Sequence, residues 1–117
     1  MAIFGMHAIL YSREAEATRR FLGDVLGFSS VDAGRGWLIF TAPPTELAVH
    51  PDESGEGRHE LYLMCDDLDT TIAELQRKGV TTGAVQEQPW GRLTHLVLPG
   101  GEQLGLYQPK HPMAITI

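Results

Sequence analysis

The sequence predicts a single α+β domain built from two similar units, each made of a strand, a helix and three further strands. Two observations lead to this prediction. A short apolar run followed by a helical stripe of apolar residues occurs twice, at an offset of about half the chain. After each helix come short strand-like stretches, separated by turn-forming glycine and proline residues. Two such units give curved sheets that are concave on one side and carry the helices on the convex side.

The first unit, about residues 3–52, begins with an apolar run at 6–12. Ser12 ends this run in a position suited to cap a helix over residues 13–26. Gly27 is suited to close that helix in a left-handed conformation. Apolar side chains lie on one face of the helix at Phe21, Leu22, Val25 and Leu26. Three predicted strands follow at 28–33, 36–42 and 45–51.

The second unit, about residues 57–109, has the same order. A strand at 60–65 is followed by Asp66 or Asp67 as the cap, and Gly79 closes the helix. The apolar stripe of this helix consists of Leu68, Ile72 and Leu75. Three predicted strands follow at 80–86, 92–99 and 102–109. Superposing His7 on Glu60 aligns HAILYSREAEAT with ELYLMCDDLDTT, so the chain looks duplicated.

The length of 117 residues suits one domain, 1–117, that ends in a tail at 110–117. We expect this apolar, β-branched tail to pack on a partner subunit or to be a disordered terminus. The formal net charge of −6 and the scattered basic residues argue against nucleic acid and membrane partners. No targeting or membrane-spanning pattern is present in the sequence, so we expect a cytoplasmic protein. Cys65 is the only cysteine, which excludes an intrachain disulfide.

The order and spacing of several short strings resemble the vicinal oxygen chelate superfamily, which includes glyoxalases, bleomycin resistance proteins and extradiol dioxygenases. These strings are HAILYS, FLGDVLGF, ELYLMCDDLD, QPWGR and PGGEQLGLYQP, and they span essentially the whole chain. The resemblance implies paired βαβββ units that form a curved half-barrel around a cavity, and a homodimer. In enzymes of the superfamily, a divalent metal is held by His or Glu from the first strand of each unit and by Glu or Gln from the last.

Carried over to this sequence, the resemblance puts metal ligands at His7 and Glu60. A carboxylate is an acceptable ligand for Zn, Mn, Fe or Mg. Gly105 stands where the superfamily has its final Glu, and glycine has no side chain that binds metal. Strand alternation allows Glu46 or His50 to supply a third ligand instead. Because a catalytic metal needs about three protein ligands, we expect no cofactor, with Zn, Mn, Ni or Fe as the alternative.

Strand alternation also identifies candidate ligand-binding residues on the cavity side. They are Tyr11, Trp37, Glu46, His50, Tyr62, Met64, Trp90 and Arg92. The tryptophans are suited to stack on an aromatic ligand, or to anchor the core or a dimer interface. Arg92 is suited to contact an anion, or to be a solvated arginine at a strand edge. His95 and His111 are given no role in the site.

These residues support two functions. The first is a protein that binds and sequesters an apolar or aromatic small molecule, similar to the bleomycin resistance proteins, without a complete metal site. The alternative is an enzyme, either a metal-dependent lyase, isomerase or dioxygenase, or a metal-free acid–base catalyst. In that alternative His7 and Glu60 are the catalytic residues.

Overall fold

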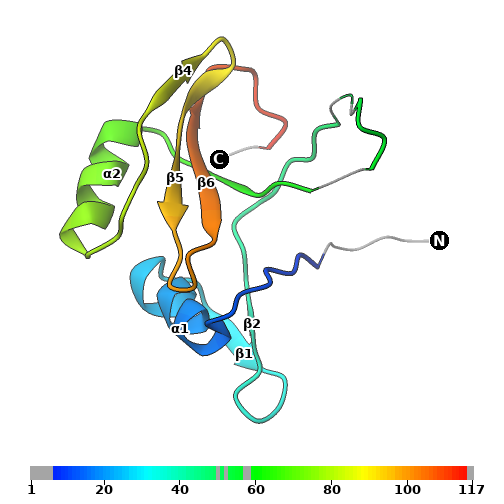
Figure 1. Ribbon diagram of the computed structural model, residues 1–117, viewed down its shortest axis with the longest axis vertical. Coiled ribbons are helices and arrows are strands. Elements are labelled where there is room, and N and C mark those ends of the chain that lie inside the picture. The colour runs from blue at the N-terminus through cyan, green and yellow to red at the C-terminus, as the bar shows by residue number, and fades with distance from the viewer. Residues whose placement is uncertain (1–6, 50, 52, 57–58, 116–117) are drawn as a thin grey trace.

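The computed structural model describes residues 7–49, 51, 53–56 and 59–115. Its elements, in chain order, are α1 (Ala15–Arg20), η1 (Phe21–Val25), β1 (Ser30–Asp32), β2 (Leu38–Phe40), β3 (Tyr62–Met64), α2 (Leu68–Arg77), β4 (Gln86–Gln88), β5 (Gly91–Val97) and β6 (Gln103–Pro109). Figure 1 shows two parts: a first half with a two-stranded sheet and a second half with a four-stranded sheet. This is the predicted α+β class with helices and mixed sheets.

The second half is built around a four-stranded sheet in which β6 lies between β3 and β5, and β4 forms an edge. Strand β3 runs parallel to β6, with Tyr62 opposite Gly105. The other neighbouring strands are antiparallel, and β5 pairs with β6 along its whole length. Because alternate residues of a strand point to opposite faces, this pairing fixes which side chains of β6 share a face.

The hydrophobic core lies between this sheet and the helices. Its buried residues are Phe21, Leu68, Leu75, Val80, Leu96, Leu98, Leu104 and Leu106. Two of them, one leucine from α2 and one from β5, have no exposed surface. In β6 the leucines at 104 and 106 alternate with Gly105 and Tyr107. One face of β6 therefore belongs to the core, and its other face carries Gly105 and Tyr107.

Helix α2 begins and ends as the sequence predicts. Of the two candidate caps it is Asp67 that acts, because its Oδ1 accepts a hydrogen bond of 3.1 Å from the Thr70 amide. Gly79 follows the helix with a φ of +83°, a backbone conformation that glycine adopts without strain. The helix is therefore held at both ends by local interactions.

The first helix differs from the predicted helix at 13–26 at its start and in its second part. It begins at Ala15, after Glu14, and has no side-chain cap, so Ser12 is not its capping residue. Residues Phe21–Val25 form a turn of π-helix, in which the Leu26 amide donates to the carbonyl of Phe21 at 3.2 Å. Ser12 lies at the start, where its Oγ accepts from the Glu14 amide at 3.1 Å and lies 3.0 Å from Thr18 Oγ1. Gly27 then takes a φ of +75°, as predicted.

Two predicted strands of the first half are not strands in the described residues. Residues 7–11 and 43–49 are extended chain, and no backbone–backbone hydrogen bond joins them to another described residue. Their apolar side chains are largely exposed: 60% for Ile9, 75% for Leu47 and 91% for Val49. The physical reason is that neither segment has a strand beside it among the described residues.

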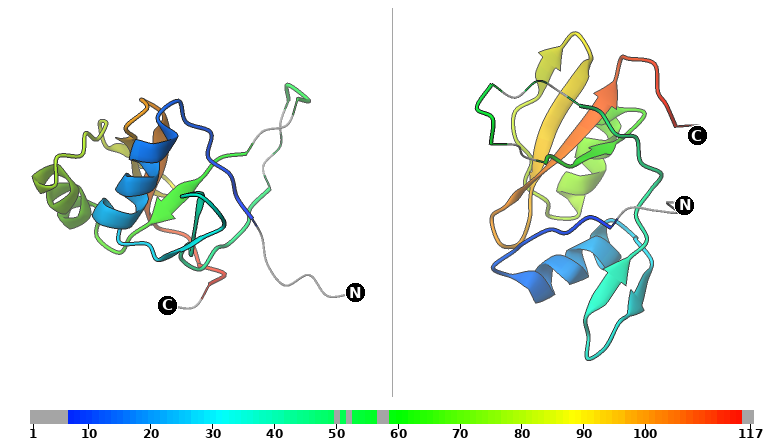
Figure 2. Two further views of the ribbon diagram at one scale, coloured as in Figure 1. Left: turned by 90° about the horizontal axis from the view of Figure 1, so that it is seen from below. Right: turned by 90° about the vertical axis from the view of Figure 1, so that its right-hand side faces the viewer.

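The two halves lie side by side, with the extended segments running between them. The right-hand view of Figure 2 shows the β1–β2 hairpin and the first helix below the four-stranded sheet, and the chain after β2 rising from the hairpin toward the level of that sheet. None of the described helices is long and apolar enough to cross a bilayer.

Replacing the helix cap tests the account of α2. We expect Asp67→Ala to lower the free energy of unfolding by about 1 kcal/mol, because the Thr70 amide loses its acceptor. Asp66→Ala is the matched control, since this neighbouring carboxylate does not cap the helix. Urea denaturation measures both variants. Equal losses in the two variants would contradict the assignment of the cap.

Candidate functional site

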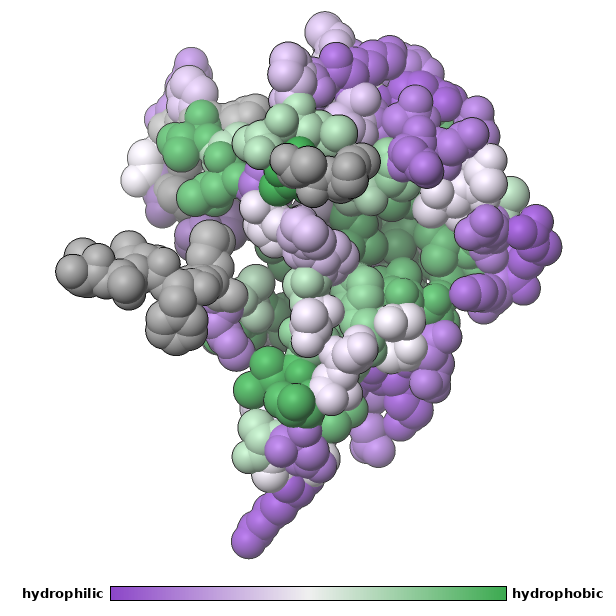
Figure 3. Space-filling model, turned by 180° about the vertical axis from the view of Figure 1, so that it is seen from behind, coloured by the Kyte–Doolittle hydropathy of each residue, from purple (hydrophilic) through white to green (hydrophobic). Residues whose placement is uncertain are grey.

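An open cleft with a volume of about 2630 Å³ lies between the two halves of the described structure. Ligand pockets generally measure about 300–1,000 Å³, so the cleft exceeds what a drug-sized molecule fills. Its walls are mostly apolar, and Figure 3 shows hydrophobic residues gathered in the hollow. The lining comes from the extended segments of the first half and from β3 and β6 of the second.

An aromatic cluster forms one wall of the cleft. The buried ring of Tyr107 lies at its centre, 5.7 Å from the Tyr62 ring and 5.6 Å from the Trp90 ring. Both contacts are edge-to-face, the arrangement that aromatic quadrupoles favour. Tyr62 is 40% exposed and Trp90 is 39% exposed, so part of each ring faces the open cleft.

A polar cluster adjoins these rings and joins β6 to the first half. The Tyr107 hydroxyl lies 3.2 Å from His111 Nε2, and this nitrogen lies 3.8 Å from Glu46 Oε1. The other Glu46 oxygen, Oε2, accepts a hydrogen bond of 2.8 Å from the Ala114 amide. Burial, and then the negative charge of Glu46, raise the pKa of Tyr107 above its ordinary value. The Tyr107 phenol therefore stays neutral in ordinary buffers.

Comparison with known proteins bears on this architecture. No protein-family model and no curated protein sequence matches the chain significantly. TnmS3, an antibiotic binding protein from Streptomyces sp. CB03234, has a similar structure with 27% identity and a TM-score of 0.68. The match covers 94% of this chain and 99% of TnmS3. A glyoxalase/bleomycin resistance protein from the same Streptomyces strain is 26% identical, with a TM-score of 0.55. This match covers 83% of the present chain and 93% of that protein.

The chain has the fold of the glyoxalase/bleomycin resistance protein/dioxygenase superfamily. This confirms the resemblance inferred from the sequence. Lactoylglutathione lyase from Agrobacterium tumefaciens has the same fold with 17% identity, a TM-score of 0.64, and coverage of 90% of this chain and 92% of the lyase. At this identity the lyase informs the fold alone.

Gly105 is covered by a neighbouring ring. Tyr62 lies opposite Gly105 in the β3–β6 pair, and a Cβ at Gly105 would lie only 2.6 Å from Tyr62 Cε1. The Tyr62 hydroxyl then reaches Glu60, donating to its Oε2 at 2.7 Å. The tyrosine ring thus takes the space that a ligating side chain at 105 would need, and its hydroxyl engages one of the two carried-over ligands.

The described residues do not fit the superfamily's three-ligand metal centre. No group of three or more His, Cys, Asp or Glu side chains able to hold an ion is found among them. His7, Glu46 and Glu60 all line the cleft, and one Glu46 oxygen, Oε2, accepts a hydrogen bond from the Ala114 amide. His50, the other candidate for a third ligand, lies outside the described residues.

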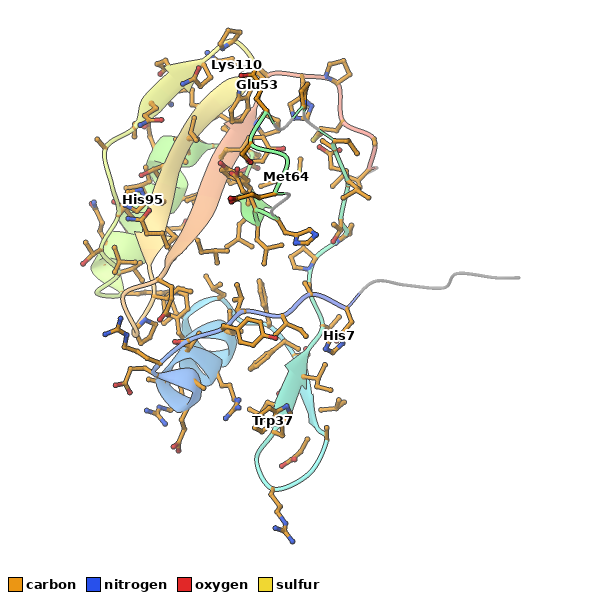
Figure 4. All side chains as sticks on the ribbon, turned by 45° about the vertical axis from the view of Figure 1, so that its right-hand side comes forward. His7, Trp37, Glu53, Met64, His95 and Lys110 are labelled. Atoms are coloured by element: carbon orange, nitrogen blue, oxygen red, sulfur yellow. The ribbon has the colours of Figure 1, made fainter. Side chains whose placement is uncertain are left out.

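The remaining predicted residues divide between the cleft and the outer surface. His7, Trp37 and Met64 line the cleft; Figure 4 shows His7 and Trp37 on the first half, Met64 on the second, and His95 far from them. Trp37 is 65% exposed and carries the guanidinium of Arg19 at 4.7 Å from its ring centre. This cation–π contact holds the ring at the cleft wall.

Two residues predicted to face the cavity lie outside the cleft lining. Tyr11 is 85% exposed, because its segment has no strand beside it. Arg92 Nε donates to Glu87 across the β4–β5 pair at 2.6 Å, and its other guanidinium nitrogens reach Asp69 of α2 at 3.2 Å. Hydrogen bonds that Arg92 donates to Asp69 and Glu87 raise the pKa of Arg92, and hydrogen bonds donated by Arg92 and Lys110 lower the pKa of Glu87. Arg92 therefore ties the sheet to α2.

Sequence reasoning missed Tyr107 and His111. Tyr107 follows Gly105 by two residues and so shares its face of β6, which was a usable signal. His111 had no such signal, because its place depends on the path of the tail after Pro109. Cys65 lies beside this cluster, with its thiol donating to the Tyr107 carbonyl at 3.6 Å, and burial raises its pKa.

The raised pKa of Tyr107 predicts a loss of stability in alkali. The folded protein holds the phenolic proton more tightly than the unfolded chain, whose tyrosines have a pKa of about 10. This stabilisation is complete below that value and is lost as the pH rises through the folded-state pKa. We expect the urea midpoint to fall between about pH 9 and about pH 11, and to fall less in Tyr107→Phe. Tyr11→Phe is the control, and an equal fall in all three proteins would contradict the assignment.

Proposed function

We propose that the protein binds an apolar or aromatic small molecule in the cleft and sequesters it without transforming it. The observation that carries this proposal is the aromatic cluster of Tyr62, Tyr107 and Trp90, whose outer rings are partly exposed in an apolar cleft. The likeness to TnmS3, an antibiotic binding protein, over nearly the whole of both chains supports it. We propose that the protein does this in the cytoplasm.

The energetics of the cluster favour a ligand. Apolar surface removed from water contributes roughly 25 cal/mol per Å², and a flat ring that covers Trp90 and Tyr62 removes surface from both partners. Tyr107 is fixed by contacts on both sides, so little side-chain freedom is lost when a ligand is bound. Such a preorganised aromatic wall suits a rigid, planar molecule.

We also propose that two copies of the chain form the binding unit. The extended segments 7–11 and 43–49 present apolar side chains and unpaired backbone groups, which form a template for pairing with another chain. The cleft, at about 2630 Å³, has room for part of a second copy as well as for a ligand. A second copy would cover this surface and reduce the cleft to the size of a ligand pocket.

A binding screen tests the proposed function. We expect at least one planar aromatic compound to change the tryptophan fluorescence saturably, and Trp90→Ala to weaken its binding by at least about tenfold. Val31→Ala is the control, because Val31 lies on the β1–β2 hairpin outside the cleft lining. No binding across planar aromatic, aliphatic and glycosidic classes would contradict the proposal. Turnover of a bound compound that is lost in Glu60→Gln would replace it with the enzymatic alternative.

Sedimentation velocity tests the proposed dimer. We expect a particle of twice the 12.9 kDa chain mass at micromolar concentration, and a monomer when Val49→Asp places a charge in the exposed segment. Val31→Asp is the matched control, since Val31 is also largely exposed, at 67%, but lies on the hairpin. A wild-type monomer at about 100 μM, far above the Kd of a stable dimer, would contradict the proposal.

A further inference from the structure

We propose that Glu46 and Tyr107 form a polar subsite at the aromatic wall of the cleft, which recognises a positively charged, hydrogen-bond-donating group on an aromatic ligand. An ammonium or amidinium group is the chemical class that fits. This inference rests on the proposed function, because it names the kind of ligand that the cleft takes.

The hydrogen bonds of His111 leave the Tyr107 oxygen as an acceptor. His111 Nδ1 lies 2.8 Å from the Pro112 carbonyl oxygen, which only accepts, so Nδ1 carries the proton and donates to it. In the neutral ring Nε2 is then the acceptor, and the Tyr107 hydroxyl at 3.2 Å donates to it. With its proton used in this way, the phenolic oxygen has only lone pairs to offer a ligand in the cleft.

Glu46 supplies a second acceptor beside it. Its Oε2 accepts from the Ala114 amide, whereas Oε1 lies 3.8 Å from the nearest basic nitrogen, which is beyond hydrogen-bond length. The Glu46 side chain is 17% exposed, so its charge is poorly solvated. A carboxylate in such a place is stabilised when an opposite charge comes close to it.

No other protein cation of the described residues is placed to neutralise Glu46. Arg19, the one arginine that lines the cleft, lies over the Trp37 ring, and Lys110 is bonded to Glu87. The phenol of Tyr107 is neutral, so the charge of the subsite is that of the carboxylate. The net charge of −6 adds a weak attraction for cations over the whole molecule.

The aromatic rings complete the recognition of a cation. The Trp90 and Tyr62 rings stand nearly perpendicular to the Tyr107 ring, and part of each lies open to the cleft, where a ligand can lie over a ring face. A cation over such a face is attracted by the ring quadrupole, and the attraction grows where water is excluded. A ligand with an aromatic body and a cationic substituent would therefore contact the rings and the Glu46–Tyr107 acceptors together.

A series of three naphthalene probes of equal shape tests this inference. They are 1-naphthylmethylamine, 1-naphthalenemethanol and 1-naphthoic acid, which are cationic, neutral and anionic at neutral pH. We expect the wild-type protein to bind the amine about tenfold more tightly than the alcohol, and the acid more weakly than either. Isothermal titration calorimetry measures all three at one ionic strength.

Variants assign the preference to the subsite. Glu46→Gln is expected to abolish the preference for the amine over the alcohol, because it removes the carboxylate charge and keeps the shape of the side chain. Glu74→Gln, an exposed carboxylate on α2 outside the cleft, is the matched control and keeps the preference. Tyr107→Phe is expected to weaken the binding of the amine several-fold. If Glu46→Gln does not fold, loss of the preference at high salt in the wild-type protein takes its place.

The outcomes separate this inference from the proposed function. Equal binding of amine and alcohol by the wild-type protein, or a preference that survives Glu46→Gln, overturns the cationic subsite and leaves the proposed function standing. A preference that survives high salt in the wild-type protein overturns the subsite in the same way. No binding of any of the three probes overturns the inference.

Discussion

Strand β6 is the element on which both the core and the cleft depend. It pairs with β3 on one side and with β5 on the other, and its side chains alternate between two tasks. Leu104 and Leu106 are buried in the core, whereas Gly105 and Tyr107 lie on the opposite face. A shift of one residue in its register would exchange the two sets of side chains, and so would disrupt the core and the wall of the cleft together.

The missing side chain at Gly105 shapes the chemistry of the cleft. It lets the Tyr62 ring lie over β6, and from there Tyr62 reaches Glu60 with its hydroxyl and Tyr107 with its ring edge. The space beside Gly105 is thus filled by an aromatic contact. This contact is part of the wall that we propose to bind a planar molecule.

Local interactions explain what the sequence could predict. The Asp67 cap, the left-handed Gly27 and Gly79, and the strands β5 and β6 all depend on residues close together in the chain, so their patterns are visible without the fold. Segments 7–11 and 43–49 have equally apolar patterns, but a strand also needs a neighbour, and the described part of the chain supplies none. Pattern alone does not reveal which backbone will supply the partner.

The candidate site was predicted in part for the same reason. Alternation selected Tyr62, Met64 and Trp90, which line the cleft. It also selected Arg92, whose side chain is taken by Asp69 and Glu87, because alternation gives a face but not the partners on it. The contact of Tyr107 with His111 and Glu46 joins three distant or irregular segments, so only the folded structure could reveal it.

The most direct test of the account is a nuclear magnetic resonance titration that follows the two indole N–H signals while a planar aromatic compound is added. The signals are assigned with Trp37→Phe and Trp90→Phe. The account predicts that the Trp90 signal moves saturably, with the Kd that calorimetry gives, because this ring belongs to the binding wall. Saturable binding that leaves the Trp90 signal unmoved would contradict the claim that this wall holds the ligand.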